Sequence, residues 1–203
     1  MFEYNSEYLN QGIGTGGAYI NQSGVYEMAI SEAYLLKMQN TYSEALILEL
    51  EDLEEKKAKV NIWYKNKNGE KVEFQEKHIT HLMYLLSINP KTIKSTLNTE
   101  KNREEIQVFK DKIIGVILEF SGTEQYTGND GNEYTRYNYN LKGFYDVTTK
   151  ATADEKRNGK ETKTYNYWKE RFERENQKME NKQNRNQQEN KNDEDLEDDF
   201  PFN

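Results

Sequence analysis

Cysteine is absent from the 203 residues of this chain, and proline occurs only twice. Without cysteine the chain cannot form disulfides, thiolate zinc sites or cysteine-bound iron–sulfur clusters, and such a composition fits the reducing cytoplasm. No apolar run approaches the roughly 20 residues that a membrane span requires. Residues 1–4 have neither the basic nor the hydrophobic part of a secretion signal. The sequence therefore predicts a cytoplasmic protein with no membrane partner and no metal or other cofactor.

Charge is distributed unevenly along the chain. The net charge is −8, from 28 basic and 36 acidic residues. Because residues 193–203 hold six acidic side chains and no basic one, residues 1–192 carry a net charge of only −2. A nearly neutral body can still present a basic groove, since phosphate responds to the local field rather than to the total charge. The overall acidity therefore does not exclude a nucleic-acid partner.

Aromatic residues are numerous for so polar a chain. It has 15 Tyr, 8 Phe and 2 Trp, while hydrophobic residues make up 34% and charged residues 32% of the sequence. That balance suits one folded domain with poorly ordered ends better than two separate cores. A core of this size is not expected to absorb every ring, so some rings should lie on the surface.

Residues 1–23 are rich in Asn, Gln and Gly and are predicted to form a flexible N-terminal arm. Between Gly12 and Gly17 they contain the spacing Gly-x-Gly-x-x-Gly. A dinucleotide site needs a buried strand before such a loop and a helix that begins within it. Neither flanking segment has that pattern, so a nucleotide cofactor is not expected.

Alternating apolar residues predict a β-rich domain over residues 24–150. An Asn-Gly turn at residues 68–69 should lead into a strand containing Val72 and Phe74, so that residues 58–75 form a hairpin. The first strands are expected near residues 26–30, 46–50 and 58–64.

A helix is predicted next, because apolar residues recur at helical spacing from Ile79 to Leu86 and Pro90 follows. His78 and His81 lie three residues apart on this helix, which is the spacing of half a metal site. The chain has no third His and no Cys to complete such a site, so both histidines are expected to face solvent or to cap the helix. A polar connection is expected over residues 91–105.

Two long strands complete the domain, at residues 113–120 and 133–145. Five or six twisted strands, with one helix between the first group and the last, predict a mainly β, OB-fold-like barrel. Alternation on the last strand places on one face Tyr137, Tyr139, Leu141 and Tyr145. The opposite face then carries Tyr134, Arg136, Asn138, Asn140 and Lys142.

Beyond the barrel, residues 151–180 are predicted to form a polar connection and a C-terminal helix. Tyr165, Trp168 and Phe172 make a narrow apolar stripe on this helix, which should dock on the barrel or on another subunit. Residues 181–203 are predicted to be disordered, with an Asn/Gln-rich linker that tethers an acidic protein-interaction tail. Such a segment cannot bury enough apolar area to order itself.

The acidic tail ends in residues that packing within one chain does not explain. Two rings stand beside a run of carboxylates there, in Asp198, Asp199, Phe200, Pro201 and Phe202. Because these rings have nothing of their own to pack against, a pocket on a partner protein is expected, with basic residues meeting the acids. This ending resembles the acidic tip of bacterial and bacteriophage single-stranded DNA-binding proteins, apart from the additional Asn203.

The resemblance extends to the layout of residues 24–150, which is similar to that of phage-encoded single-stranded DNA-binding proteins with an OB-fold. It implies sequence-independent binding and protection of single-stranded DNA during DNA replication, recombination and repair. It also implies recruitment of replication and recombination proteins by the tail, and no catalytic activity. The oligomeric state is left open, a homo-oligomer included.

Candidate DNA-binding residues follow from alternation on two strands. If the apolar residues of the strand at 58–64 point into the barrel, Trp63 lies outside between two lysines, where a base could stack and phosphates could bind. The predicted DNA-binding residues are Lys59, Asn61, Trp63, Lys65, Tyr134, Arg136 and Lys142. A bulge that shifts the register would make the stacking set Tyr64, Tyr137 and Tyr139 instead. Alternatively, the helix at residues 165–179 covers Trp63.

The predicted mechanism has two parts. The basic groove holds DNA, and the acidic tail competes for the same groove until DNA displaces it. A strand-annealing or recombination mediator would use the same groove and stays open as an alternative. So does a protein that binds only other proteins through its tail. An alternative of another class is a metal-dependent nuclease. Its candidate ligands are adjacent in one segment, which is more typical of a solvated acidic loop: Glu49, Glu51, Asp52, Glu54 and Glu55.

Overall fold

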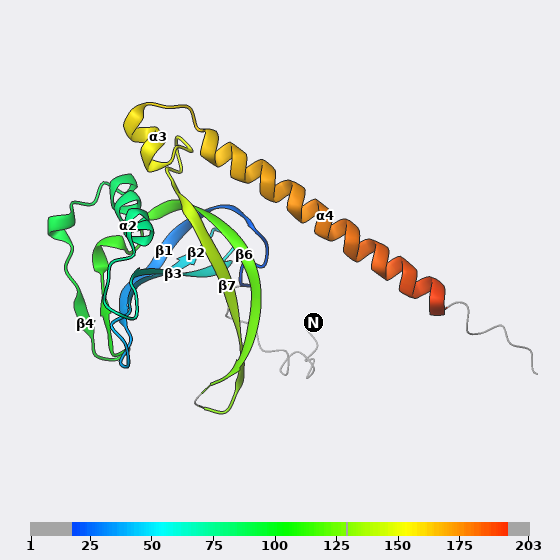
Figure 1. Ribbon diagram of the computed structural model, residues 1–203, viewed down its shortest axis with the longest axis horizontal. Helices are drawn as coiled ribbons and strands as arrows, with labels where there is room; N and C mark the ends of the chain where they lie inside the picture. Colours follow the sequence, from blue (N-terminus) through cyan, green and yellow to red (C-terminus); the bar gives the residue numbers. More distant parts are fainter. Residues whose placement is uncertain (1–17, 129, 195–203) are drawn as a thin grey trace, which may run out of the picture.

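The computed structural model describes residues 18–128 and 130–194 (Figure 1). The domain is mainly β, with a seven-stranded antiparallel sheet curled around its main core. The elements are β1 (Gly24–Lys37), β2 (Glu44–Glu51), β3 (Lys57–Lys65), α2 (Glu73–Leu85), η1 (Pro90–Thr92), β4 (Thr96–Asn98), β5 (Arg103–Glu105), η2 (Gln107–Phe109), β6 (Ile113–Thr127), β7 (Glu133–Tyr145), α3 (Ala153–Asn158) and α4 (Lys163–Glu194).

β1 is the strand on which the sheet is built. Its first half pairs with β6, its second half pairs with β5, and β2 pairs with it along residues 29–37. The ladder with β2 shifts between Ile30 and Glu32, which marks a bulge where the strand bends. β3 pairs with β2, and β7 pairs with β6. Within the described residues no ladder joins β3 to β7, so the barrel is open along that seam.

This arrangement confirms the predicted fold class, a mainly β, OB-fold-like domain. Three strands, a helix and two long strands follow one another as expected, and partial closure is a feature of the OB-fold. The sheet has seven strands instead of five or six, because the connection at residues 91–105 contains the short β4–β5 hairpin. Three-residue strands are too short to show alternation in a sequence.

The core lies between the curled sheet and α2. The alternation predicted for β3 is confirmed, since Ala58, Val60 and Ile62 are buried while Lys59 and Asn61 are exposed. α2 closes one end of the barrel with Leu82. The other main contributors to the core are Met28, Ile30, Leu46, Leu48, Leu50, Ile114, Val116, Leu118 and Phe144.

The predicted strand through Val72 and Phe74 is wrong, because α2 begins at Glu73. An isolated bridge between Lys65 and Lys71 is what remains of the expected hairpin. Acidic side chains in the first turn of α2 favour the helix, since its first N–H groups attract negative charge. Two apolar residues separated by one polar residue are too short a pattern to distinguish a strand from a helical turn.

The expectation that both helix histidines face solvent or cap the helix is wrong for His78. Its side chain is 5% exposed and makes edge contacts with the rings of Phe74 and Phe144. His78 precedes Leu82 by four residues, so it lies on the buried stripe of α2. His81 lies at the edge of that stripe and is partly buried, and its Nε2 atom is 3.9 Å from a carboxylate oxygen of Asp154.

Residues 18–23 pack against the barrel, which corrects the predicted boundary of the N-terminal arm. Ile20 is buried, and its backbone N–H donates to the Lys57 carbonyl oxygen at 2.9 Å. The Lys57 N–H in turn donates to the Ala18 carbonyl oxygen at 3.0 Å. The Tyr139 hydroxyl donates to the Ile20 carbonyl oxygen at 2.6 Å. Residues 1–17, with the glycine-rich spacing, lie outside the described residues.

A β-bulge reverses the end of β7. In the ladder with β6, Lys142 is an extra residue between Leu141 and Gly143. After it the alternation inverts, so Phe144 joins the barrel core while Tyr145 faces α4. The prediction that Tyr145 shares a face with the other tyrosines of this strand is therefore wrong.

The apolar stripe of the C-terminal helix docks on the barrel, as one of the two predicted alternatives stated. Phe172 is 1% exposed and packs with Ile117 and Tyr145, while Tyr165 and Trp168 border this contact. Part of the predicted polar connection forms α3, which begins at a capping box.

α4 continues through the Asn/Gln-rich residues 181–192, and Figure 1 shows it projecting away from the barrel. This corrects the predicted disordered linker. The chain has no Gly or Pro between Gly159 and Pro201, and Gln, Glu, Lys and Arg are good helix formers. The docked first turns supply the nucleus from which such a helix extends. In the described ranges no helix is long and apolar enough to cross a bilayer.

Candidate nucleic-acid interface

A groove follows the open seam between β3 and β7. Its volume is about 750 Å³. β3 forms one wall, the β6–β7 hairpin forms the other, and β1 and β2 form the floor. Its aromatic lining residues are Tyr19, Tyr34, Trp63, Tyr126, Tyr137 and Tyr139.

The β3 wall consists of three of the predicted DNA-binding residues, Lys59, Asn61 and Trp63. They alternate with the buried residues of β3, so the pleat of the strand places all three on the groove side. The apolar stripe of α4 packs elsewhere, against β1, β6 and the end of β7. α4 therefore leaves Trp63 uncovered.

The floor of the groove is a second, smaller apolar cluster. Tyr34, Ala45 and Ile47 are buried there and pack with Leu36 and Trp63. β2 thus buries side chains on both of its faces. The continuous apolar run in β2 is the signal that could have predicted this, because it is typical of a strand covered on both sides.

β7 supplies residues from both of its faces to the second wall. Arg136 belongs to the predicted outward set, whereas Tyr137 and Tyr139 belong to the alternative set that a register shift would expose. The ladder between β6 and β7 does shift, with Ser121 as an extra residue. The Tyr137 ring also stacks on Tyr19, with centroids 4.8 Å apart and planes 9° apart.

The tip of the β6–β7 hairpin carries a further aromatic pair. The rings of Tyr126 and Tyr134 stack with centroids 5.7 Å apart, and the guanidinium carbon of Arg136 lies 4.9 Å from the Tyr126 centroid. The Tyr134 hydroxyl donates to Asp130 at 2.6 Å. Tyr126 and Arg136 line the groove, and Tyr134 packs against Tyr126.

Carboxylates neutralise the two cations of the groove walls. The Lys59 ammonium lies 3.4 Å from Glu49 Oε1. Burial lowers the pKa of Lys59, but Tyr34 and Glu49 raise it more, so the pKa lies above its ordinary value. An Arg136 guanidinium nitrogen lies 3.4 Å from the exposed Glu124 carboxylate on β6. Such an exposed ion pair contributes about 1 kcal/mol or less to stability. The raised pKa keeps Lys59 charged at neutral pH, and a phosphate can replace the carboxylate partner of either cation.

Tyr34 is held in the floor from both ends. The Arg103 guanidinium carbon lies 3.9 Å from its ring centroid, and its hydroxyl donates to Glu49 Oε1 at 3.1 Å. Arg103 also forms an ion pair with Glu32. The β4–β5 hairpin, which carries Arg103, therefore fixes one aromatic residue of the groove.

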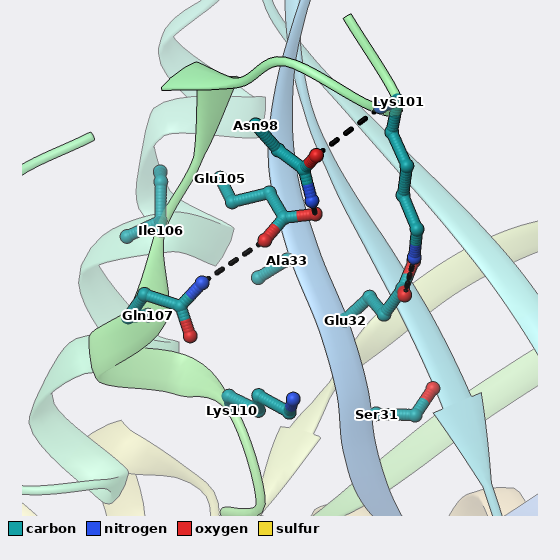
Figure 2. Close-up of a pocket in the computed structure, with 9 residues that line it drawn as sticks. All are labelled: Ser31, Glu32, Ala33, Asn98, Lys101, Glu105, Ile106, Gln107 and Lys110. Atoms are coloured by element: carbon teal, nitrogen blue, oxygen red, sulfur yellow. Dashed lines mark hydrogen bonds and ion pairs between the residues drawn. The ribbon is translucent and has the colours of Figure 1, made fainter. Parts of the chain in front are cut away.

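Figure 2 shows the polar pocket of about 140 Å³ between β1 and this hairpin. Lys101 reaches across it to Glu32, and Glu105 accepts a hydrogen bond from the Asn98 amide at 2.9 Å. Burial raises the pKa of Glu32, but the bonds from Lys101 and Arg103 outweigh it and lower the pKa to about 2. These carboxylates are already satisfied by protein donors, so the pocket stabilises the hairpin.

Two predicted lysines lie outside the groove lining. Lys65, at the end of β3, pairs with Glu44 at 2.9 Å. Tyr64, from the alternative stacking set, donates to the same carboxylate at 2.7 Å and lines a separate pocket beside α2. Lys142 pairs with Glu119 at 2.8 Å, beside α4.

The acidic segment proposed as metal ligands is engaged in other contacts. Glu49 pairs with Lys59, and Glu54 pairs with Lys56 at 2.6 Å. Asp52 accepts backbone N–H bonds from Glu54 and Lys56 at 2.9 and 2.8 Å. Within the part of the chain that the structure describes, no three His, Cys, Asp or Glu side chains are placed to hold a metal together. No geometry there favours the nuclease alternative.

Compared with known protein families and with curated proteins, the chain matches no family and no curated protein. The candidate interface therefore depends on the groove itself. Sequence reasoning missed Tyr19, Tyr34 and Tyr126 as groove residues. Tyr19 falls in the predicted arm and Tyr126 falls between the two long predicted strands, and their proximity to Trp63 is a consequence of the tertiary fold.

Proposed function

We propose that this protein binds single-stranded DNA without reading its sequence and protects it during DNA replication, recombination and repair, in a bacteriophage or bacterial setting, without catalysing a reaction. The observation that carries the proposal is the open groove, in which several aromatic rings stand beside Lys59 and Arg136. Stacking a base on an aromatic side chain is worth about 1–3 kcal/mol and accepts any base. Rings with cations beside them therefore suit unpaired nucleotides.

Duplex DNA is a poor ligand for such a site, because its bases are already stacked and cannot reach the rings. RNA is a closer competitor, since stacking does not depend on the 2′-hydroxyl. The comparison of DNA with RNA therefore tests preference, whereas the comparison of single strands with duplex tests the mechanism.

Binding in the groove should depend only modestly on salt. If Lys59 and Arg136 each contact one phosphate, the slope of log K against log salt concentration is about −1.4 for a single strand. Raising salt from about 50 to 200 mM then weakens binding about sevenfold. A much steeper loss would mean that phosphate contacts outside the groove dominate binding.

The acidic tail is proposed to recruit replication and recombination proteins, with Asp198, Asp199, Phe200, Pro201 and Phe202 as the contacting residues. These residues lie outside the described residues, so the support for this part is the sequence. The helical course of residues 181–194 bears on the predicted competition for the groove. That competition assumes a flexible linker over residues 181–192, and these residues belong to α4.

The experiment that tests binding uses intrinsic fluorescence. The chain has two tryptophans, so the Trp168→Phe variant leaves Trp63 as the single reporter in the groove. Oligo-dT, oligo-rU and a duplex should be titrated at two salt concentrations. Oligo-dT should quench Trp63, and the duplex should have little effect. If purified protein ignores poly-dT even in dilute buffer, the proposal is wrong.

Trp63→Ala should lower the affinity for oligo-dT by about 5- to 150-fold, which corresponds to the loss of one base stack. Fluorescence anisotropy of labelled oligo-dT measures this without a tryptophan. Tyr42→Ala is the matched control, because Tyr42 is 75% exposed in the loop between β1 and β2 and does not line the groove. Equal affinities of both variants and the unaltered protein would remove Trp63 from the interface.

A further inference from the structure

A second group of rings and cations lies where α4 crosses the end of β7. The guanidinium carbon of Arg171 lies 5.0 Å from the Trp168 ring centroid, and the Lys142 ammonium lies 5.7 Å from it. Tyr167 contacts Trp168 edge to face, with centroids 5.3 Å apart. Two cations and a second ring, supplied by β7 and α4, therefore meet at the Trp168 indole.

Docking of α4 does not account for all of these side chains. Phe172 is 1% exposed and carries the packing against the barrel, whereas Tyr167 is 54% exposed. Arg171 keeps 37% of its side chain exposed, and Lys142 keeps 27%. The group is thus accessible from solvent while its rings are held by the docked helix.

The group is continuous with the groove. Asn140 lines the groove and donates to Glu119 at 2.9 Å. Glu119 also binds Lys142, at 2.8 Å, and Lys142 lies against Trp168. On β7 only one residue separates Asn140 from Lys142, a step of about 7 Å along a strand.

We infer that a single strand leaving the groove continues over β7 onto α4, where Trp168 and Tyr167 offer stacking surfaces and Lys142 and Arg171 bind phosphate. The inference rests on the proposed function and extends its binding site. In the unbound protein Lys142 forms an ion pair with Glu119 and Arg171 forms one with Glu175, each at 2.8 Å. Phosphates of the strand take their places, as at the groove cations. The predicted role of Lys142 in DNA binding then belongs to this second surface.

The first test compares two single-tryptophan variants and two oligonucleotides. Trp63→Phe leaves Trp168 as the reporter of the second surface, and Trp168→Phe leaves Trp63 as the reporter of the groove. Binding sites of OB-folds range from about 4 to 16 nucleotides, so oligo-dT of these two lengths is used at saturating concentrations. Both lengths should quench Trp63, whereas only the longer one should quench Trp168.

The outcomes separate the two proposals. If Trp63 responds and Trp168 stays silent with the longer oligonucleotide, the second surface is refuted while binding in the groove stands. If Trp168 responds equally to both lengths, the surface does not follow the groove in the way inferred. If neither reporter responds and anisotropy shows no binding, the proposed function itself fails.

The second test uses salt dependence. Each phosphate contact adds about −0.7 to the slope of log K against log salt concentration. With two further cations, the affinity for the long oligonucleotide should fall about 50-fold between about 50 and 200 mM salt, whereas that for the short one should fall about sevenfold. Arg171→Gln removes one phosphate contact, so the fall in affinity for the long oligonucleotide should be about 2.6 times smaller. Lys169→Gln is the matched control, because an exposed residue two positions away points to another side of the helix. If both variants show the unaltered slope, Arg171 does not bind phosphate.

Discussion

Lowering the pH from 7.5 to 5.0 should destabilise the fold by about 2 kcal/mol through His78 alone. Burial, with a smaller contribution from the charge of His81, lowers the pKa of His78 from 6.5 to about 4. Its Nε2 atom has no hydrogen-bond partner among the described residues, so no hydrogen bond there stabilises the protonated imidazole in the folded protein. Between these two pKa values the unfolded chain binds a proton that the folded chain does not, so stability falls as the pH drops. The loss reaches about 3 kcal/mol below pH 4.

Carboxylates with lowered pKa values act in a different pH range. Lys101 and Arg103 hold the pKa of Glu32 at about 2 against the opposing effect of burial, and Lys156 holds that of Asp146 at about 2. Their stabilising contribution is present above the unfolded pKa values of 4.5 and 3.8 and is lost as the pH falls below them. Between pH 7.5 and pH 5.0 they contribute almost nothing to the change.

The assay is urea unfolding, followed by tryptophan fluorescence and circular dichroism at pH 7.5, 6.0 and 5.0. The His78→Leu variant keeps a side chain of similar size without a titrating group, so its free energy of unfolding should change by about 2 kcal/mol less than that of the unaltered protein. His81→Gln is the control, and it should retain most of the pH dependence. If His78→Leu shows the same pH dependence as the unaltered protein, the burial of a neutral His78 is not its cause.

Two further predictions concern packing. Phe172→Ala should reduce the free energy of unfolding, measured by thermal unfolding, by about 3–5 kcal/mol. Tyr167→Ala should change it by no more than about 0.5 kcal/mol. Equal losses for the two variants would mean that Phe172 does not carry the docking of α4. Gly115→Ala would place a Cβ atom in steric conflict with the ring of Tyr145 and should cost about 1–3 kcal/mol. At Gly143, by contrast, a Cβ would meet no described heavy atom within 4 Å. If alanine is tolerated equally at both glycines in urea unfolding, the close approach at Gly115 is not tight.

Local periodicity was sufficient to predict which side chains are buried and which face outward in elements that bury only one face. On β3 the alternation identified Lys59, Asn61 and Trp63 as outward residues, and all three line the groove. The stripe ending at Phe172 predicted a docked helix, and Phe172 is buried against the barrel. In each case the pleat of a strand or the turn of a helix repeats every few residues, so neighbouring sequence contains the information.

Periodicity failed where a distant part of the chain changes the pattern. The extra residue Lys142 inverts the end of β7, and a bulge leaves no mark in the composition of a strand. His78 is buried because Phe144, 66 positions away along the chain, supplies the opposing ring. The second half of α4 has no apolar stripe that predicts it, and it continues a helix whose first turns are docked.

The amino-acid sequence by itself determined the long strands, the helix between them and the outward residues of β3, because each depends on interactions within a few positions. The tertiary structure alone decided that Tyr19, Tyr34 and Trp63 share one groove and that Lys142 lies with the aromatic residues of α4. Such proximity depends on how the sheet curls and where its seam opens. Those are properties of the complete barrel, which no short stretch of sequence contains.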